Sequence, residues 1–127
     1  MVNLITRDEL NALIESGEVR VVDALGGSYY EKQHLPGAVP LVADDVATQA
    51  ATLLPNRSAA IVTYCSNTAC PNSGNVARLL VGAGYTSVRK YAEGIEDWVA
   101  TGLPTESGAM TSPSARTGTA QERRRNL

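Results

Sequence analysis

Apolar residues follow two different spacings along the first hundred residues of the chain. Three segments are short, apolar and rich in β-branched side chains, which is typical of buried strands. They are residues 19–23, 59–64 and 86–91. A further apolar stretch, residues 38–42, follows the turn expected at Pro36-Gly37. Between these stretches the apolar residues recur at the spacing of one helix face, so the pattern predicts an alternation of strands and helices.

Start and stop signals mark the predicted helices. Thr6 followed by Glu9 is a capping box, and Gly17 ends the first helical pattern. Later patterns cover residues 44–54, 73–83 and 93–100 and end at Pro55, Gly84 and Gly102 in turn. Alternating strands and helices of this kind favour an α/β fold, with a parallel sheet covered by helices on both faces.

The composition changes near residue 105. Residues 106–127 are rich in Ser, Thr, Gly, Ala and Arg and carry almost no large apolar side chains. Such a segment cannot bury enough apolar surface to offset the entropy of ordering. We therefore expect one domain over residues 1–105 and a disordered tail over residues 106–127.

Charge and hydropathy narrow the choice of partner and compartment. The chain has 127 residues, 43% of them hydrophobic, and a net charge of −2. It has no basic stripe, which argues against nucleic-acid and membrane partners, and no apolar run of membrane-spanning length. The two cysteines, Cys65 and Cys70, are too few for a disulfide-stapled secreted domain. We expect a cytoplasmic protein with reactive thiols and a small-molecule ligand.

Cys65 comes directly after the predicted strand 59–64 and before the predicted helix 73–83. Ligands of open parallel sheets bind at this edge, where strands turn into helices. If the loop curls around the sulfur, backbone N–H groups and the helix N-terminus lower its pKa and favour the thiolate. A thiolate can take a sulfane sulfur from a donor, hold it as a persulfide and pass it on.

Four stretches in this order resemble the rhodanese family over about residues 2–105. They are Val21-Val22-Asp23, Gln33-His34-Leu35-Pro36-Gly37-Ala38, Tyr64-Cys65, and Gly94-Ile95-Glu96-Asp97-Trp98 with Gly102-Leu103-Pro104. The resemblance implies the rhodanese-like three-layer α/β fold, with a central, mostly parallel five-stranded sheet and helices on both faces. It also implies a sulfurtransferase that moves sulfane sulfur from thiosulfate, polysulfide or persulfide to a thiol, to cyanide or to a protein acceptor, without a cofactor.

The same resemblance implies roles for individual residues. Cys65 is the persulfide-forming nucleophile, and Asp23, His34 and Trp98 are mainly structural. Apart from the resemblance, Arg78, on the helix after the loop, could add positive charge as a supporting residue or could be an ordinary solvated surface residue. The backbone amides of the following residues form the cradle for the substrate: Ser66, Asn67, Thr68, Ala69 and Cys70.

The chain departs from the family pattern at two charged positions. Leu25 and Cys70 stand where family members often carry Arg, and the loop from Cys65 to Ser73 holds no cation. We therefore expect weak activity with thiosulfate and a preference for polysulfide, persulfide or a protein donor. The loop also lacks the guanidinium that the related phosphatase-like and arsenate-reducing proteins need for their oxyanion.

Two other functions fit the same residues. Cys70 could resolve a persulfide on Cys65 by forming a disulfide, so the pair could act as a thiol-disulfide redox switch, or Cys70 could be an ordinary loop residue. The chain could also be a non-catalytic rhodanese-like binding or regulatory module. A metal site is not expected, because only Cys65, Cys70 and His34 are soft or borderline ligands and structural zinc needs four.

Overall fold

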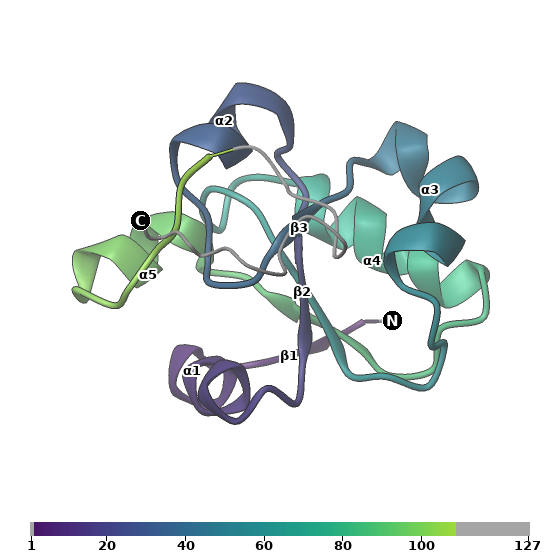
Figure 1. Ribbon diagram of the computed structural model, residues 1–127, viewed down its shortest axis with the longest axis horizontal. Coiled ribbons are helices and arrows are strands. Elements are labelled where there is room, and N and C mark those ends of the chain that lie inside the picture. Colours follow the sequence, from purple (N-terminus) through teal and green to yellow (C-terminus); the bar gives the residue numbers. More distant parts are fainter. Residues whose placement is uncertain (1, 109–127) are drawn as a thin grey trace, which may run out of the picture.

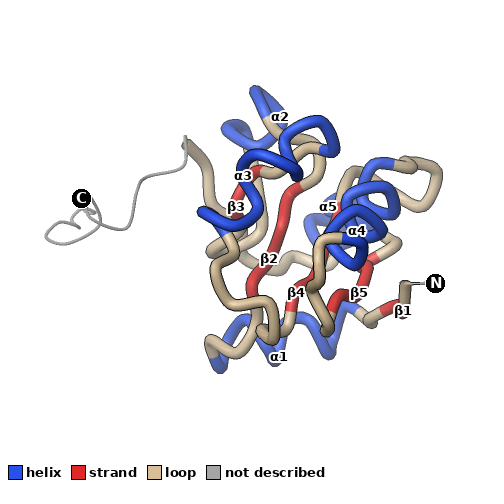
Figure 2. The backbone as a smooth tube through the Cα atoms, turned by 90° about the vertical axis from the view of Figure 1, so that its right-hand side faces the viewer, coloured by secondary structure: helices blue, strands red, loops and turns tan. Residues whose placement is uncertain are grey.

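The strands assemble into one five-stranded sheet in a computed structural model that describes residues 2–108. Its order is β1-β5-β4-β2-β3, and every neighbouring pair is parallel. The strands are β1 (Asn3–Leu4), β2 (Arg20–Asp23), β3 (Val39–Pro40), β4 (Ile61–Tyr64) and β5 (Val88–Tyr91). Figure 2 shows them side by side, with β2, β4 and β5 in the middle. The predicted parallel α/β fold is confirmed.

Helices cover both faces of this sheet. They are α1 (Arg7–Ser16), α2 (Gly27–Lys32), α3 (Val46–Leu53), α4 (Asn72–Gly82) and α5 (Gly94–Ala100), with a short 3-10 turn, η1 (Ala43–Asp45). One apolar core joins the sheet to α3 and α4, and a second joins it to α1, α2 and α5. Figure 1 shows α1 and α5 on one side of the strands and α3 and α4 on the other. None of the helices in residues 2–108 is both long and apolar enough to cross a membrane.

Side chains of β4 alternate between the two cores. Ile61 and Cys65 belong to the core under α3 and α4, whereas Val62 and Tyr64 belong to the other. This alternation is the ordinary period of a strand. It separates the thiol of Cys65 from the phenol of Tyr64, although the two residues are adjacent in the chain.

Local signals predicted some elements and missed others. The capping box is confirmed, because the Thr6 hydroxyl accepts from the Glu9 amide and the Glu9 carboxylate accepts from the Thr6 amide. The strand β1 and the helix α2 were not predicted. β1 has two residues and α2 has six, which is too short for either spacing to be recognised.

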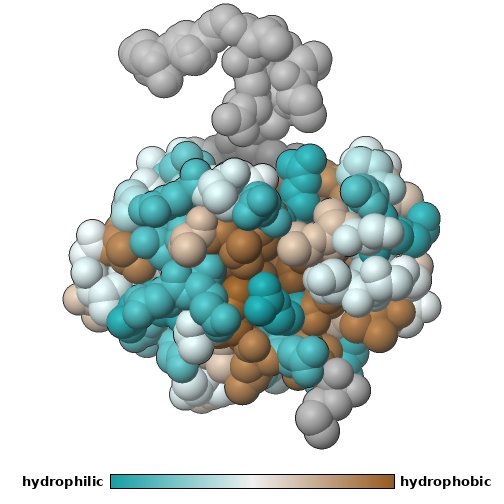
Figure 3. All heavy atoms as spheres, turned by 90° about the horizontal axis from the view of Figure 1, so that it is seen from below, coloured by the Kyte–Doolittle hydropathy of each residue, from teal (hydrophilic) through white to brown (hydrophobic). Residues whose placement is uncertain are grey.

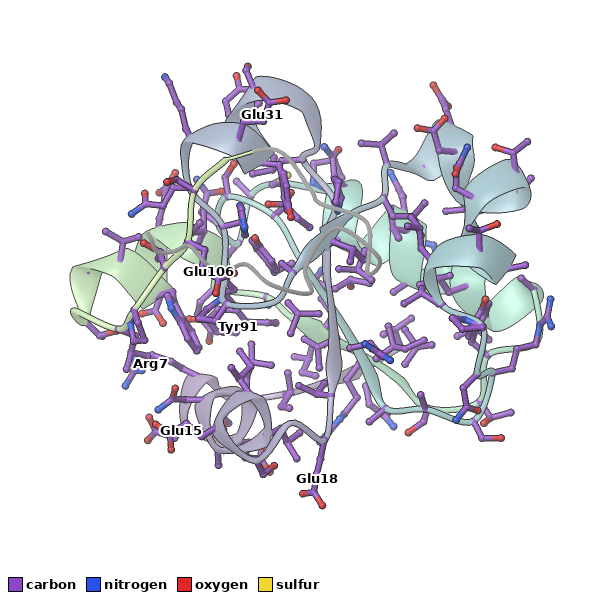
Figure 4. All side chains as sticks on the ribbon, in the orientation of Figure 1. Arg7, Glu15, Glu18, Glu31, Tyr91 and Glu106 are labelled. Carbon is purple, nitrogen blue, oxygen red and sulfur yellow. The ribbon has the colours of Figure 1, made fainter. Side chains whose placement is uncertain are left out.

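A carboxylate ties the layer of α1 and α5 to the sheet. Arg7 Nη1 lies 3.2 Å from Asp97 Oδ2, and the Tyr91 hydroxyl donates to the same oxygen at 2.5 Å. The hydrogen bond from Tyr91 and the charge of Arg7 hold the pKa of Asp97 below its usual value. Figure 4 labels Arg7 beside α1 and Tyr91 next to it on the sheet. The start of α1, the end of β5 and α5 are therefore joined.

Ordered contacts continue beyond the expected boundary at residue 105. The backbones of His34 and Glu106 exchange two hydrogen bonds of 2.8 Å, and the Gly108 amide donates to the Glu31 carbonyl at 2.7 Å. Figure 4 shows Glu106 and Glu31 in this region. The rest of the predicted tail, residues 109–127, lies outside the described residues.

The large apolar side chains exposed within residues 2–108 come from four different elements. They are Leu4, Tyr29, Leu79, Val81 and Val99. On the face drawn in Figure 3, hydrophobic residues gather toward the middle and hydrophilic ones surround them. Single exposed apolar side chains are ordinary on protein surfaces, so none of these five by itself marks a site.

Asp23 anchors the sheet edge where ligands of such folds bind. Its carboxylate is fully buried and accepts from the amides of Leu25 at 2.8 Å and Gly26 at 3.1 Å. Its other oxygen accepts from the Tyr64 hydroxyl at 2.7 Å, and that hydroxyl accepts from the Leu35 amide at 3.1 Å. Burial, and then the negative charge of Asp23, raise the pKa of Tyr64 far above its usual value. The phenol therefore stays neutral and remains a donor to Asp23.

We predict that Tyr64→Phe lowers the free energy of unfolding by about 1–3 kcal/mol, because it leaves a buried carboxylate oxygen and a buried amide without their partner. Urea unfolding measures the change. Tyr29→Phe is the matched control, because Tyr29 is 67% exposed. Equal stability of Tyr64→Phe and the wild type would contradict this account of Asp23.

Candidate active site

Cys65 lies at the carboxyl edge of the sheet, directly after β4. Asp23, Tyr64 and Tyr91 end three neighbouring strands in register there. Cys65 is only 1% exposed, whereas Cys70, in the loop before α4, is partly exposed, and both thiols are free. The structure therefore brings a buried thiol and a more accessible one to the same edge.

The loop between them is arranged differently from the expected cradle around Cys65. Asn67 takes up two of the amides, because its side-chain oxygen accepts from Ala69 at 2.9 Å and its carbonyl from Cys70 at 3.1 Å. The Asn67 amide group in turn donates to the Glu96 carboxylate at 3.1 Å, and Thr68 is exposed. An Asn at the start of a turn commonly binds the backbone two residues on, so these amides point into the loop.

Other amides reach the two sulfurs. The amide of Ser73 interacts with the sulfur of Cys65, and the amides of Ser66 and Asn72 interact with the sulfur of Cys70. The backbone donors of the loop therefore surround Cys70 more than Cys65. This difference follows from the position of Cys70 between the start of the loop and the start of α4.

Burial raises the pKa of the Cys65 thiol, and its interaction with Cys70 raises it further. Its sulfur lies 3.4 Å from the Cys70 carbonyl, which accepts from the thiol, and 3.4 Å from Ser73 Oγ. The Ser73 hydroxyl and amide act in the opposite direction, toward the thiolate. The expected lowering of the Cys65 pKa is therefore not found, because desolvation outweighs these two donors.

The pKa of Cys70 shifts the other way. Burial acts to raise it, but the hydrogen bond from Cys65 and the amides of Asn72 and Ser66 lower it below the usual value, with a further contribution from the charge of Lys90. A thiol with a lowered pKa and some exposure is the more reactive kind. The surroundings of Cys70 therefore favour its thiolate more than the surroundings of Cys65 favour the Cys65 thiolate.

Two residues at the site were not singled out from the sequence, Ser73 and Thr63. Ser73 is buried, at the start of α4, with its hydroxyl against Cys65. The Thr63 hydroxyl donates to the Ser73 carbonyl at 2.9 Å and so fixes the first turn of α4 against β4. The only sequence signal was a serine two residues after Pro71, which is typical of an ordinary helix start.

Gly94 was quoted as part of a motif, and the structure shows why glycine stands there. Its φ is 73°, and a Cβ would lie 2.5 Å from the carbonyl oxygens of both Cys65 and Ser66. The next amides of α5 bind these carbonyls, Ile95 to Cys65 at 2.9 Å and Glu96 to Ser66 at 3.0 Å. The first turn of α5 thus holds the beginning of the loop.

The remaining predicted residues lie apart from the sulfur. His34 stacks on Tyr30, with ring centroids 3.8 Å apart, and its Nδ1 lies 2.7 Å from the Tyr30 carbonyl oxygen. Trp98 is fully buried and donates to the Pro104 carbonyl at 2.8 Å. Arg78, on α4, donates to the side chain of Asn75. Within residues 2–108, no three His, Cys, Asp or Glu side chains gather as a metal site would need.

We predict that Gly94→Ala lowers the free energy of unfolding by about 2–4 kcal/mol, since it adds left-handed strain and a backbone clash. Chemical denaturation measures this change. Gly102→Ala is the control, because Gly102 also has a positive φ, 80°, but a Cβ there meets nothing within 4 Å. If both variants lose the same stability, the clash with the loop contributes nothing.

We predict that Ser73→Ala slows alkylation of Cys65 at neutral pH by about threefold to tenfold, because losing a donor to the thiolate raises its pKa by up to about one unit. Iodoacetamide labelling across pH, read by peptide mass, gives the midpoint for each cysteine. Ser87→Ala, at an exposed serine before β5, should leave it unchanged. An unmoved midpoint in Ser73→Ala would rule out this role for the hydroxyl.

Comparison with known proteins gives the same architecture. The family model of the rhodanese-like domain matches residues 6–101. The chain is 34% identical over 105 residues to the HTH-type transcriptional regulator Rv0324 of Mycobacterium tuberculosis, with 83% of this chain and 45% of that protein aligned. It therefore spans about half the length of that relative.

Two solved structures are similar to this one. The rhodanese-like domain of the Alr3790 protein from Anabaena sp. superposes with a TM-score of 0.72 and 25% identity, covering 94% of this chain and 86% of that one. The thiosulfate sulfurtransferase of Pseudomonas aeruginosa superposes with a TM-score of 0.70 and 20% identity, covering 94% of this chain and 24% of that one. With the family match and the cysteine after β4, these results show that the chain belongs to the rhodanese-like family.

Proposed function

We propose that this protein is a sulfurtransferase that carries sulfane sulfur as a persulfide on Cys65. The observation that carries the proposal is the position of this thiol, buried at the carboxyl edge of a parallel sheet with Ser73 Oγ 3.4 Å from its sulfur and the hydroxyl and amide of Ser73 acting to lower its pKa. These donors can stabilise negative charge on sulfur as it develops. The membership of the family and the likeness to a sulfurtransferase support the same reaction.

The reaction has two displacement steps. In the first, the Cys65 thiolate attacks the sulfane sulfur of a donor, a new S–S bond forms, and the rest of the donor leaves with the electron pair of the broken bond. In the second, an acceptor thiolate attacks the outer sulfur, takes it as its own persulfide, and leaves Cys65 as the thiolate. Neither step needs a cofactor, because the transferred sulfane sulfur already has the oxidation level of a persulfide.

A second outcome for the persulfide is favoured by the contact between the two thiols. The Cys70 thiolate can attack the inner sulfur of the Cys65 persulfide, which forms a Cys65–Cys70 disulfide and releases hydrosulfide. Such a disulfide would report sulfur or oxidant to a partner. This use fits the mycobacterial relative, which is named as a transcriptional regulator, and both free thiols fit the reducing cytoplasm.

The experiment that tests the proposal is the intact mass of the purified protein after treatment with polysulfide. We expect the wild type to gain the mass of one sulfur atom, to lose it on addition of cyanide with formation of thiocyanate, and to lose it also to a small thiol acceptor. Peptide mass should place this sulfur on Cys65, and a wild type that carries it on Cys70 alone would contradict the assignment of the nucleophile.

Cys70→Ser separates the two outcomes. Under sulfur transfer it should still load one sulfur and hold it longer, whereas the wild type should release part of it as hydrosulfide and lose two hydrogens. No loading of the wild type by any sulfane donor would overturn the sulfurtransferase proposal. A disulfide formed by oxidant alone, with no stored sulfur, would leave only the redox function.

A further inference from the structure

Two positive side chains from different elements converge beside the start of α4. Arg78 Nη1 and Lys90 Nζ lie 3.4 Å and 3.5 Å from the point that a Cβ on Gly74 would occupy. Arg78 belongs to α4 itself, and Lys90 is the third residue of β5, in register with Thr63 of β4. Because Gly74 has no side chain, both cationic groups can approach its backbone closely.

No carboxylate neutralises this pair within residues 2–108. The ion pairs there involve Arg7 and His34, and Arg78 is bound only to the neutral side chain of Asn75. Two like charges that converge without a counter-ion repel each other, and the repulsion is relieved when an anion binds between them. The arrangement therefore favours a negatively charged ligand at this position.

The cation pair lies beside Gly74, the residue after Ser73, whose hydroxyl oxygen is 3.4 Å from the sulfur of Cys65. The charge of Lys90 acts on the sulfur of Cys70, and Cys70 interacts directly with Cys65. Cys70 is also the more exposed of the two thiols.

We propose that Arg78 and Lys90 form a subsite beside Gly74 that binds the oxyanion group of a small sulfane-sulfur donor and presents its sulfur to the two thiols. The inference rests on the proposed sulfur transfer, and it adds that the sulfur donor is an anion. For thiosulfate the balance is simple: Cys65 bonds to the sulfane sulfur, and sulfite leaves with the electron pair of the broken S–S bond.

This subsite changes one expectation drawn from the sequence. Weak thiosulfate activity was expected because the loop from Cys65 to Ser73 carries no cation. The structure brings positive charge to the loop from α4 and β5 instead, at residues that follow the loop in the chain. An anionic donor is therefore not at a disadvantage, and thiosulfate becomes a suitable probe.

The first test compares two alkylating reagents on Cys70 in the full chain, anionic iodoacetate and neutral iodoacetamide. The ratio of their rates removes the effect of thiol ionisation and reports the local field on the reagent. We expect Lys90→Gln and Arg78→Gln each to lower the iodoacetate-to-iodoacetamide ratio by about threefold to tenfold, and added salt to lower it in the wild type. Lys90→Arg should restore most of it.

Arg89→Gln is the matched control. Arg89 is the neighbour of Lys90 on β5 but pairs in register with Val62, whose side chain belongs to the core on the opposite face of the sheet. Its replacement removes the same charge and should leave the ratio unchanged. An unchanged ratio in both Lys90→Gln and Arg78→Gln, or an equal fall in Arg89→Gln, would overturn the subsite.

The second test measures sulfur loading of Cys65 from three donors. Thiosulfate carries a sulfonate-type oxyanion, glutathione persulfide carries carboxylates, and dimethyl trisulfide is uncharged. Lys90→Gln should slow loading by the anionic donor that uses the subsite and leave dimethyl trisulfide unaffected, so the affected donor identifies the oxyanion. Equal slowing with dimethyl trisulfide would overturn the subsite, whereas failure of all three donors in the wild type would overturn the proposed function and leave the alkylation result standing.

Discussion

The close approach of α5 to the end of β4 is the contact on which the site depends. Gly94 lies so near the carbonyls of Cys65 and Ser66 that no other residue fits, and the following amides bind those carbonyls. Both carbonyls face α5, whereas the thiol of Cys65 faces Ser73 of α4. The first helix therefore holds the backbone of Cys65, and the second surrounds its sulfur.

The surroundings of the two cysteines affect their thiols in opposite ways. Cys65 is buried against Ser73, and this burial raises the free energy of its charged form. Cys70 sits where loop amides and the Lys90 charge favour ionisation. Under the proposed function, the burial of Cys65 would shield a persulfide from solvent, and a thiolate on Cys70 could discharge it.

The loop between the two cysteines has no cation of its own, and positive charge comes from two elements outside it. Arg78 comes from the helix after the loop and Lys90 from the adjacent strand, and the missing side chain of Gly74 lets them converge. On the other face of the sheet, Asp23 and Tyr64 stabilise the neighbouring strand ends without touching the sulfur. The residues that stabilise the strand ends thus lie on one face of the sheet, and the sulfur of Cys65 lies on the other.

The sequence by itself determined the capping box at Thr6 and the position of Cys65 at a strand end, because these depend on spacings within one element. It also determined the parallel α/β fold, because the strands and helices alternate along the chain. It did not predict β1 or α2, which are too short for a spacing to show. Only the tertiary structure decided that Asn67 binds loop amides, that the Ser73 hydroxyl lies against Cys65, and that Lys90 and Arg78 both approach Gly74. Burial and the approach of charged groups depend on residues from separate elements, and no local sequence pattern shows which of these residues come together.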